Sequence, residues 1–311
     1  MKMVCMLLFP LLLTSCIDFD RQTLSYHYDE ELDTLRIFQN YEGLFGSEKG
    51  EGITSEEKQQ LASLYENGRT FFFGNWIWEY NETSTRAFAN EPFSKENEDV
   101  DGPPTPQERE AHQALLAVAR LLLAHVHIDN GAFYRNAQGE LCAYQRVTIH
   151  QVSQIIDAAN IAIAKHILEI DGPGDLREYQ QLRPAAVANH AYIRREGNQF
   201  SYHWPLPHSE FKRVKNQWSQ ALKAAIQSEL PAEKNSELIS ARNLMEQEIW
   251  LSYLDDILVV TAGYPTNTLT RVQLDGDKDP IDNLGDYIGR TYGVDNQLDV
   301  KKIEQDFLLG K

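Results

Sequence analysis

The chain has 311 residues, of which 42% are hydrophobic, enough for one large domain or two small ones with an ordinary apolar core. It carries 46 acidic and 29 basic residues, a formal net charge of −17, so the composition excludes nucleic acid and anionic lipid headgroups as expected partners, because both are bound through Lys and Arg. The charge is compatible with a cation or a basic partner, although solubility is the commoner reason for it.

The first residues have the layout of an export signal. Lys2 precedes an apolar stretch over residues 3–13, which is about half of the ~20 residues that a helix needs to span a bilayer. The stretch ends in Leu13-Thr14-Ser15-Cys16, which resembles the lipobox of bacterial lipoproteins. An ordinary cleaved signal that a cysteine happens to follow is the alternative.

The lipobox resemblance implies an address in the cell envelope. Residues 1–15 would be removed, and Cys16 would carry a diacylglycerol at the start of a mature region over 16–311. Ile17 stands where an aspartate would, by resemblance to enterobacterial lipoproteins, imply retention at the inner membrane, so the outer membrane is favoured. With Cys16 alkylated, Cys142 has no cysteine partner and is expected to be a buried small side chain.

The mature region is predicted to open with a β-hairpin and a helix. Apolar residues alternate over 24–28 and again over 35–37, on either side of an acidic turn at 29–33. Thr54 and Glu57 then form a capping-box pattern, which predicts a helix from there to about residue 67.

Two segments follow that differ sharply in composition. Residues 71–80 are the densest aromatic run in the chain and are predicted to form a core strand, with stacking on sugar rings as the alternative. Residues 82–104 are rich in polar residues and end near paired prolines, so an exposed loop is expected there. A subdomain boundary of the mature region could fall in that loop.

A helix followed by a metal-like pattern comes next. Thr105-Pro106-Gln107-Glu108 combines a capping box with proline at the first helical position. The helix leads into His125-Val126-His127-Ile128-Asp129. If this segment is extended, His125, His127 and Asp129 point to one face about 7 Å apart, and imidazole with carboxylate suits zinc.

The zinc hypothesis has a competing interpretation. The spacing is similar to the opening of the metallo-β-lactamase signature, but that signature continues with His where this chain has Asn130, so the chain is not assigned to that family. His150, His190 or His203 would have to complete the site. Otherwise these side chains lie on a solvent-exposed face where the helix gives way to a strand.

The remaining elements alternate between strands and helices. In chain order they are a hairpin over 132–149 with its turn at 136–139, a helix from 152 to 163, a hairpin turning at 196–198, a helix over 209–228, a hairpin over 250–262 turning at 255–256, a strand over 268–274, and a helix over 299–309. Hairpins and helices recur at irregular spacing. This pattern predicts an α+β fold, with an antiparallel sheet built from several hairpins and helices packed on one face.

A second metal-like pattern lies near the C-terminus. Asp275, Asp277, Asp279 and Asp286 occupy positions one, three, five and twelve of a segment that resembles an EF-hand calcium loop. Pro280 stands where that loop needs a glycine with positive φ. A helix capped by Asp279 and begun by Pro280 is the competing interpretation.

Two functions of different classes follow from these patterns. The chain has no G-x-S-x-G motif, no P-loop and no dinucleotide-binding glycine fingerprint, so no cofactor is expected. The first hypothesis is a non-catalytic, lipid-anchored envelope protein that binds a protein or glycan partner or assembles with one. The second is a metal-assisted hydrolase that uses His125, His127 and Asp129.

Overall fold

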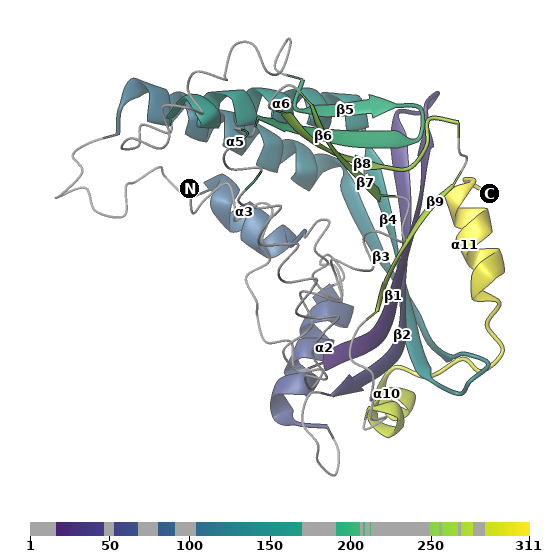
Figure 1. Ribbon diagram of the computed structural model, residues 1–311. Coiled ribbons are helices and arrows are strands. Elements are labelled where there is room, and N and C mark those ends of the chain that lie inside the picture. Colours follow the sequence, from purple (N-terminus) through teal and green to yellow (C-terminus); the bar gives the residue numbers. More distant parts are fainter. Residues whose placement is uncertain are drawn as a thin grey trace.

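The computed structural model describes part of the chain, and everything below refers to that part. It covers residues 17–46, 53–67, 80–90, 104–169, 191–205, 208, 212, 249–254, 257–266, 269–275 and 284–311. There the strands form two antiparallel sheets with helices packed against them, which confirms the predicted α+β class (Figure 1). The lipobox and Cys16 lie outside this range. None of the helices described is both long and apolar enough to cross a membrane.

A five-stranded sheet forms the centre of the molecule. Its order is β3-β4-β2-β1-β9, with β1 (Ile17–Asp29), β2 (Thr34–Gly46), β3 (Val126–Arg135), β4 (Leu141–His150) and β9 (Thr270–Asp275). The first two predicted hairpins are confirmed as β1–β2 and β3–β4. Because β2 pairs with β4, strands from both sides of residues 82–104 share this sheet, and a boundary in that segment would fall between paired strands.

A smaller sheet has the order β5-β6-β8-β7. It consists of β5 (Ile193–Glu196), β6 (Gln199–Pro205), β7 (Ile249–Leu254) and β8 (Ile257–Ala262). Both hairpins predicted here are confirmed, since β5 pairs with β6 and β7 pairs with β8. Gly197 in the first turn has a φ of +55°, and a Cβ there would come within 2.3 Å of the Pro265 carbonyl oxygen, so the turn requires glycine.

The helices begin largely where capping residues predict them. They are α2 (Ser55–Asn67), α3 (Glu82–Asn90), α5 (Pro106–His125), α6 (Val152–Glu169), α10 (Gly285–Thr291) and α11 (Val300–Leu308). The capping box of α5 is confirmed, because Thr105 Oγ1 accepts from the Glu108 amide at 3.2 Å and Glu108 accepts from the Thr105 amide at 2.6 Å. The helix expected over 209–228 lies outside the described residues except at residue 212, which is helical.

Helix α3 corrects one prediction, since an exposed loop was expected from residue 82. Asn81 caps the helix by accepting from the Ser84 amide at 2.9 Å, and Glu82 and Arg86 form an ion pair one turn apart. Phe88 packs edge-on against His112 of α5, with ring centroids 5.5 Å apart. The cap and the packing against a neighbouring helix outweigh the polar composition of the segment.

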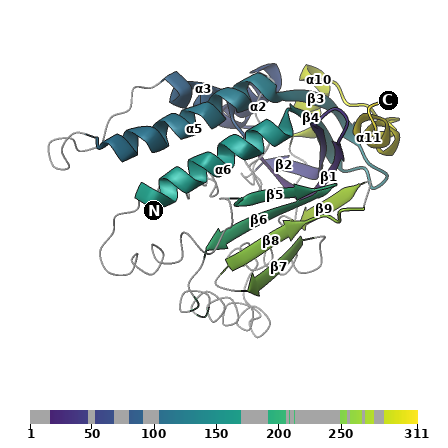
Figure 2. The ribbon, with the colours of Figure 1, turned by 90° about the horizontal axis from the view of Figure 1, so that it is seen from above.

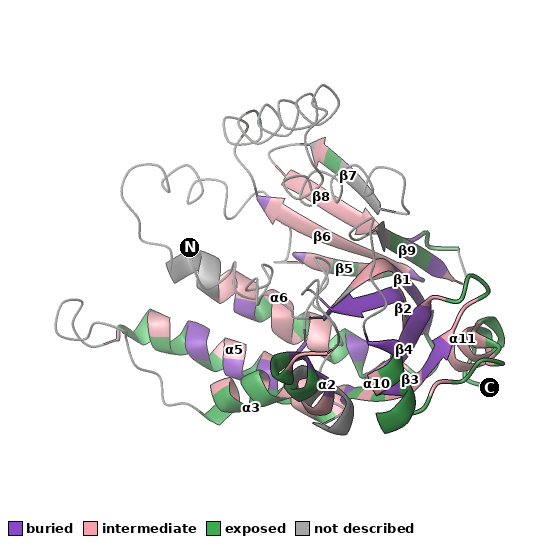
Figure 3. Cartoon of the chain, turned by 90° about the horizontal axis from the view of Figure 1, so that it is seen from below, coloured by how far each residue is buried: buried purple, intermediate pink, exposed green. Residues whose placement is uncertain are grey.

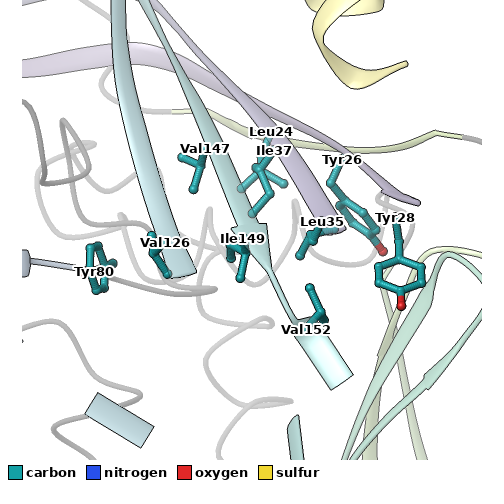
Figure 4. Close-up of a cluster of buried hydrophobic side chains, with 10 residues drawn as sticks. All are labelled: Leu24, Tyr26, Tyr28, Leu35, Ile37, Tyr80, Val126, Val147, Ile149 and Val152. Atoms are coloured by element: carbon teal, nitrogen blue, oxygen red, sulfur yellow. The ribbon is translucent and has the colours of Figure 1, made fainter. Parts of the chain in front are cut away.

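The core lies mainly on one face of the five-stranded sheet, which we call the inner face. It is formed by Leu24, Tyr26, Tyr28, Leu35, Ile37, Tyr80, Val126, Val147, Ile149 and Val152, whose side chains are drawn in Figure 4. Helices α5 and α6 lie side by side over this face (Figure 2). Tyr80 is the one described residue of the aromatic run, and its burial agrees with the core interpretation at that position.

The opposite, outer face is covered in part by a single helix. Leu308 of α11 is fully buried with Phe38, Cys142 and Tyr144, and the Phe38 and Tyr144 rings stack at 5.0 Å. Figure 1 shows α11 on the other side of the sheet from α5 and α6. Helices therefore pack on both faces, whereas the sequence predicted them on one; the larger share, α5 and α6, lies on the inner face.

The β1–β2 turn is fastened to the start of α6. Asp33 has a φ of +47°, and its carboxylate accepts from the Ser153 amide at 3.0 Å and from the Tyr28 hydroxyl at 2.7 Å. Burial alone would raise the pKa of Asp33, but these hydrogen bonds outweigh it and hold the pKa below its ordinary value. Asp33 thus caps α6 from a different element and joins the hairpin to the helix layer.

Candidate functional site

The structure places the three residues of the zinc hypothesis at a helix-to-strand junction. His125 is the last residue of α5, whereas His127 and Asp129 are exposed on β3. The strand alternation that the hypothesis assumed therefore does not include His125. Asp129 lies 3.9 Å from Arg146 of the neighbouring strand, which is the arrangement of a solvent-exposed cross-strand ion pair.

His150 is the histidine that comes nearest to this group. Its ring lies edge-on to that of His127, with centroids 5.5 Å apart, and its Nδ1 is 3.1 Å from the Thr34 hydroxyl. Desolvation and the charges of His127 and His125 lower the pKa of His150. Within the described residues, no three His, Cys, Asp or Glu side chains are arranged to hold a metal ion. His203 lies in the smaller sheet, and His190 is outside the described residues.

The calcium-like segment is described only at its two ends. Asp275 ends β9, and Asp286 lies in the first turn of α10. Asp277 and Asp279 fall outside the described residues, so calcium binding and the competing helix cap both stay predictions. Helix α10 itself begins at Gly285 after Leu284, without a side-chain cap.

Cys142 lies on the outer face of β4 beneath α11. Its side chain is fully buried and forms no disulfide, as expected for a small apolar residue. Burial raises the pKa of the thiol to about 11, so the reactive thiolate is scarce at neutral pH.

Among the described residues, a group of polar side chains also gathers on the smaller sheet. The face of this sheet away from the core, which we call the distal face, has a hollow of about 440 Å³. Its lining includes Arg194, Ser201, His203, Val259 and Thr261. The opposite face carries Phe200 and Val260, which pack against the inner-face core. Because side chains alternate between the two faces of a strand, the polar side chains point to the distal face. The apolar side chains on the opposite face hold the strands against the core.

Side chains from three strands meet in this sheet hollow. Arg194 of β5 is the cross-strand partner of Ser201 of β6, and Ser201 is in turn the partner of Thr261 of β8. Directly opposed residues have Cβ atoms about 5 Å apart, so a guanidinium and two hydroxyls form one row. His203 comes next on the same face of β6, and its Nε2 is 2.9 Å from the Ser201 hydroxyl.

The electrostatics keep this histidine uncharged. Burial and then the Arg194 guanidinium lower the pKa of His203 below its ordinary value, so the imidazole is neutral at pH 7. A neutral imidazole beside a serine hydroxyl can accept its proton, as nucleophilic catalysis requires. No carboxylate among the described residues hydrogen-bonds His203 to orient it as the third member of a triad. The pair therefore provides hydrogen bonds rather than a complete catalytic set within this region.

A second hollow, of about 540 Å³, lies between β3 and the chain after α10. Its lining combines Phe133 with the consecutive residues 292–297. Asp295 accepts from the Gln297 amide at 2.8 Å, so its carboxylate is engaged within its own loop. The polar groups of this hollow come from one loop, so it is a weaker candidate for a binding site than the hollow lined by three paired strands.

Sequence reasoning missed the sheet hollow for a clear reason. Tyr202 and Trp204, which alternate with Ser201 and His203, predict a core strand, and half of that prediction is right because one face is core. The polar half becomes visible only when β5 and β8 are paired with β6. Alternation of Ser and His between aromatic residues was the available signal.

The comparisons with known proteins give no family for this fold or site: the chain matches no protein-family model, no curated protein and no solved structure.

Proposed function

We propose that the protein is a lipid-anchored binding protein of the cell envelope, held at a membrane through Cys16 and binding a small ligand in the sheet hollow. The observation that carries the proposal is the convergence of polar side chains from three paired strands on one hollow. Its volume of about 440 Å³ falls in the range of small-molecule sites, and paired strands hold the side chains more rigidly than a loop would.

The anchor part of the proposal rests on the lipobox. Each buried methylene contributes about 0.8 kcal/mol, so two or three acyl chains on Cys16 would hold the protein firmly at a bilayer. Ile17 after the cysteine favours the outer membrane. Residue Ile17 also begins β1, so the folded region would follow the lipid directly, close to the membrane surface.

The anchor is tested by mass and by fractionation. We expect the intact mass of the natural protein to equal residues 16–311 plus a diacylglyceryl group and any further acyl chain. The Cys16→Ala variant should leave the membrane fraction without detergent. An unmodified Cys16 in the natural protein would refute the anchor.

The hollow is tested by filling it. Thr261→Trp places an indole in the hollow, and Thr261 is suitable for this change because it is only half-buried. In a thermal-shift screen of sugars, amino acids and phosphate esters, we expect ligands that raise the Tm of the natural protein but not of Thr261→Trp. Ligands that stabilise both proteins equally would show that binding occurs elsewhere.

A metal-assisted hydrolase at His125, His127 and Asp129 is the second candidate. The 5.5 Å distance between the ring centroids of His127 and His150 favours it. Two imidazoles at this separation could both bind one zinc ion after a small change in side-chain rotamer. Metal analysis of the natural protein after mild purification tests this candidate. Absence of zinc, together with hydrolysis unchanged in His127→Ala, would refute it.

A further inference from the structure

The row of donors in the sheet hollow has a definite chemical character. Arg194 contributes a guanidinium, and Ser201 and Thr261 contribute hydroxyls from the adjacent strands. The guanidinium is held in place, because its Nε donates to the Ala191 carbonyl oxygen at 3.0 Å. That bond uses the Nε–H and leaves the donors of the two terminal nitrogens for other acceptors.

The charge of this arginine is not neutralised by the described part of the protein. Within the described ranges no carboxylate pairs with Arg194, although the chain has 46 acidic residues for 29 basic ones. Seven other basic side chains in the same ranges do pair with acids at 3.9 Å or less, including Arg21 and Arg271. The effect of Arg194 reaches into the hollow, because it contributes to the lowered pKa of His203.

The other charged residues around the hollow do not all face it. Arg195 also lines the hollow, but its guanidinium lies 4.0 Å from the centre of the Tyr28 ring and donates to the Gly197 carbonyl. Glu196 is the one acid in the described lining. The distal face therefore presents one guanidinium, that of Arg194, and one carboxylate, that of Glu196, and the two form no ion pair within the described ranges.

We propose that the sheet hollow binds the oxyanion group, a carboxylate or a phosphate, of a small ligand through the Arg194 guanidinium and the Ser201 and Thr261 hydroxyls. The inference rests on the proposed binding function and adds the ligand class to it. A planar guanidinium matches either oxyanion through two parallel N–H donors. His203 holds the Ser201 hydroxyl by the 2.9 Å contact, and the rest of the ligand would lie against Val259.

The direct test uses the mature lipidated protein in detergent and simple probes. Inorganic phosphate, acetate and neutral glucose are titrated at constant ionic strength, and binding is followed by the NMR shifts of the His203 ring and by Tm. We expect millimolar binding of phosphate, acetate or both, with the relative affinities distinguishing a phosphate ligand from a carboxylate ligand. Glucose should not bind in the same range.

Variants of the donor residues test whether they bind the oxyanion. Arg194→Gln should weaken oxyanion binding at least tenfold, and Ser201→Ala about threefold, because a charged donor contributes more than a neutral one. Arg290→Gln is the matched control, since Arg290 is an exposed arginine whose Nε also donates to a backbone carbonyl, and its helix α10 packs against the five-stranded sheet. Its oxyanion affinity should equal that of the natural protein.

The outcomes distinguish failure of the oxyanion inference from failure of the proposed ligand-binding function. Oxyanion binding that is unchanged in Arg194→Gln, or no binding of phosphate and acetate at 50 mM (~50 times a millimolar Kd), overturns the inference. If glucose or another neutral ligand then binds and Thr261→Trp abolishes it, the hollow is still a binding site and only the ligand class is wrong. If Thr261→Trp alters the binding of no probe, the proposed function fails as well.

Discussion

The two sheets of this protein differ most in how far their residues are buried. In the five-stranded sheet most residues of β2 and β4 are buried, because the inner face lies under α5 and α6 and part of the outer face lies under α11. In the smaller sheet every residue of β8 is only half-buried, as Figure 3 shows. The comparison suggests that one sheet carries most of the stability and that the other can vary its distal face for binding.

The largest expected effect is at Phe38 of β2. Its side chain is almost completely buried and lies between the Tyr144 and Phe307 rings. Phe38→Ala should therefore destabilise the protein by about 3–5 kcal/mol, measured by urea denaturation. Phe38→Leu, which keeps most of the volume, should cost less than about half of that. Equal losses would show that the cavity is not the cause of the destabilisation.

Identical substitutions in the two sheets compare them directly. Val147→Ala removes two methyl groups at a position with no solvent exposure and should cost about 2–3 kcal/mol, since a cavity adds to the lost burial. Val259→Ala, at a half-buried position of β8, should cost less than about 1 kcal/mol. Equal changes in the free energy of unfolding would contradict the division between the sheets.

Asp33 tests how the five-stranded sheet is joined to α6. Asp33→Ala loses the cap on Ser153 and places alanine at positive φ, so we expect a loss of about 2 kcal/mol. Asp33→Asn keeps an acceptor and tolerates that φ, and should lose less.

The same residue predicts a pH dependence. Because its folded pKa lies below the unfolded value, the Asp33 contribution is present above the unfolded pKa and is lost as pH falls through the folded pKa. Thermal unfolding between about pH 5 and pH 2 measures it. The difference in Tm between the natural protein and Asp33→Asn should shrink on acidification, and a difference that grows would contradict the cap.

The smallest expected effect is at Ser201 on the distal face. Ser201→Ala should change the free energy of unfolding by less than about 0.5 kcal/mol, because the position is half-buried and away from the core. Differential scanning calorimetry checks this as a Tm within about 2 °C of the natural value. A large loss would mean that the polar row is needed for folding, and the comparison between the sheets would have to be abandoned.

Local signals explain why much of the fold could be predicted. The two capping boxes at Thr54 and Thr105 and the turn at residues 136–139 act over four residues or fewer, so they are readable without knowing the fold. Helix α3 escaped prediction because its cap, Asn81, precedes a polar segment whose contact with α5 is not local. The position of His125 was wrongly predicted because α5 includes the first residue of the pattern that was taken as extended.

What the sequence alone determined is a set of short-range facts: the lipobox pattern at Cys16, the alternation of the strands, the starts of α2 and α5, and the class of the fold. Only the tertiary structure decided which polar residues face one another, as with Arg194, Ser201 and Thr261. Their separation in the chain, about 60 residues between the last two, carries no periodic signal. Strand pairing alone brings them together, because it is fixed by the burial of the opposite face rather than by the polar residues themselves.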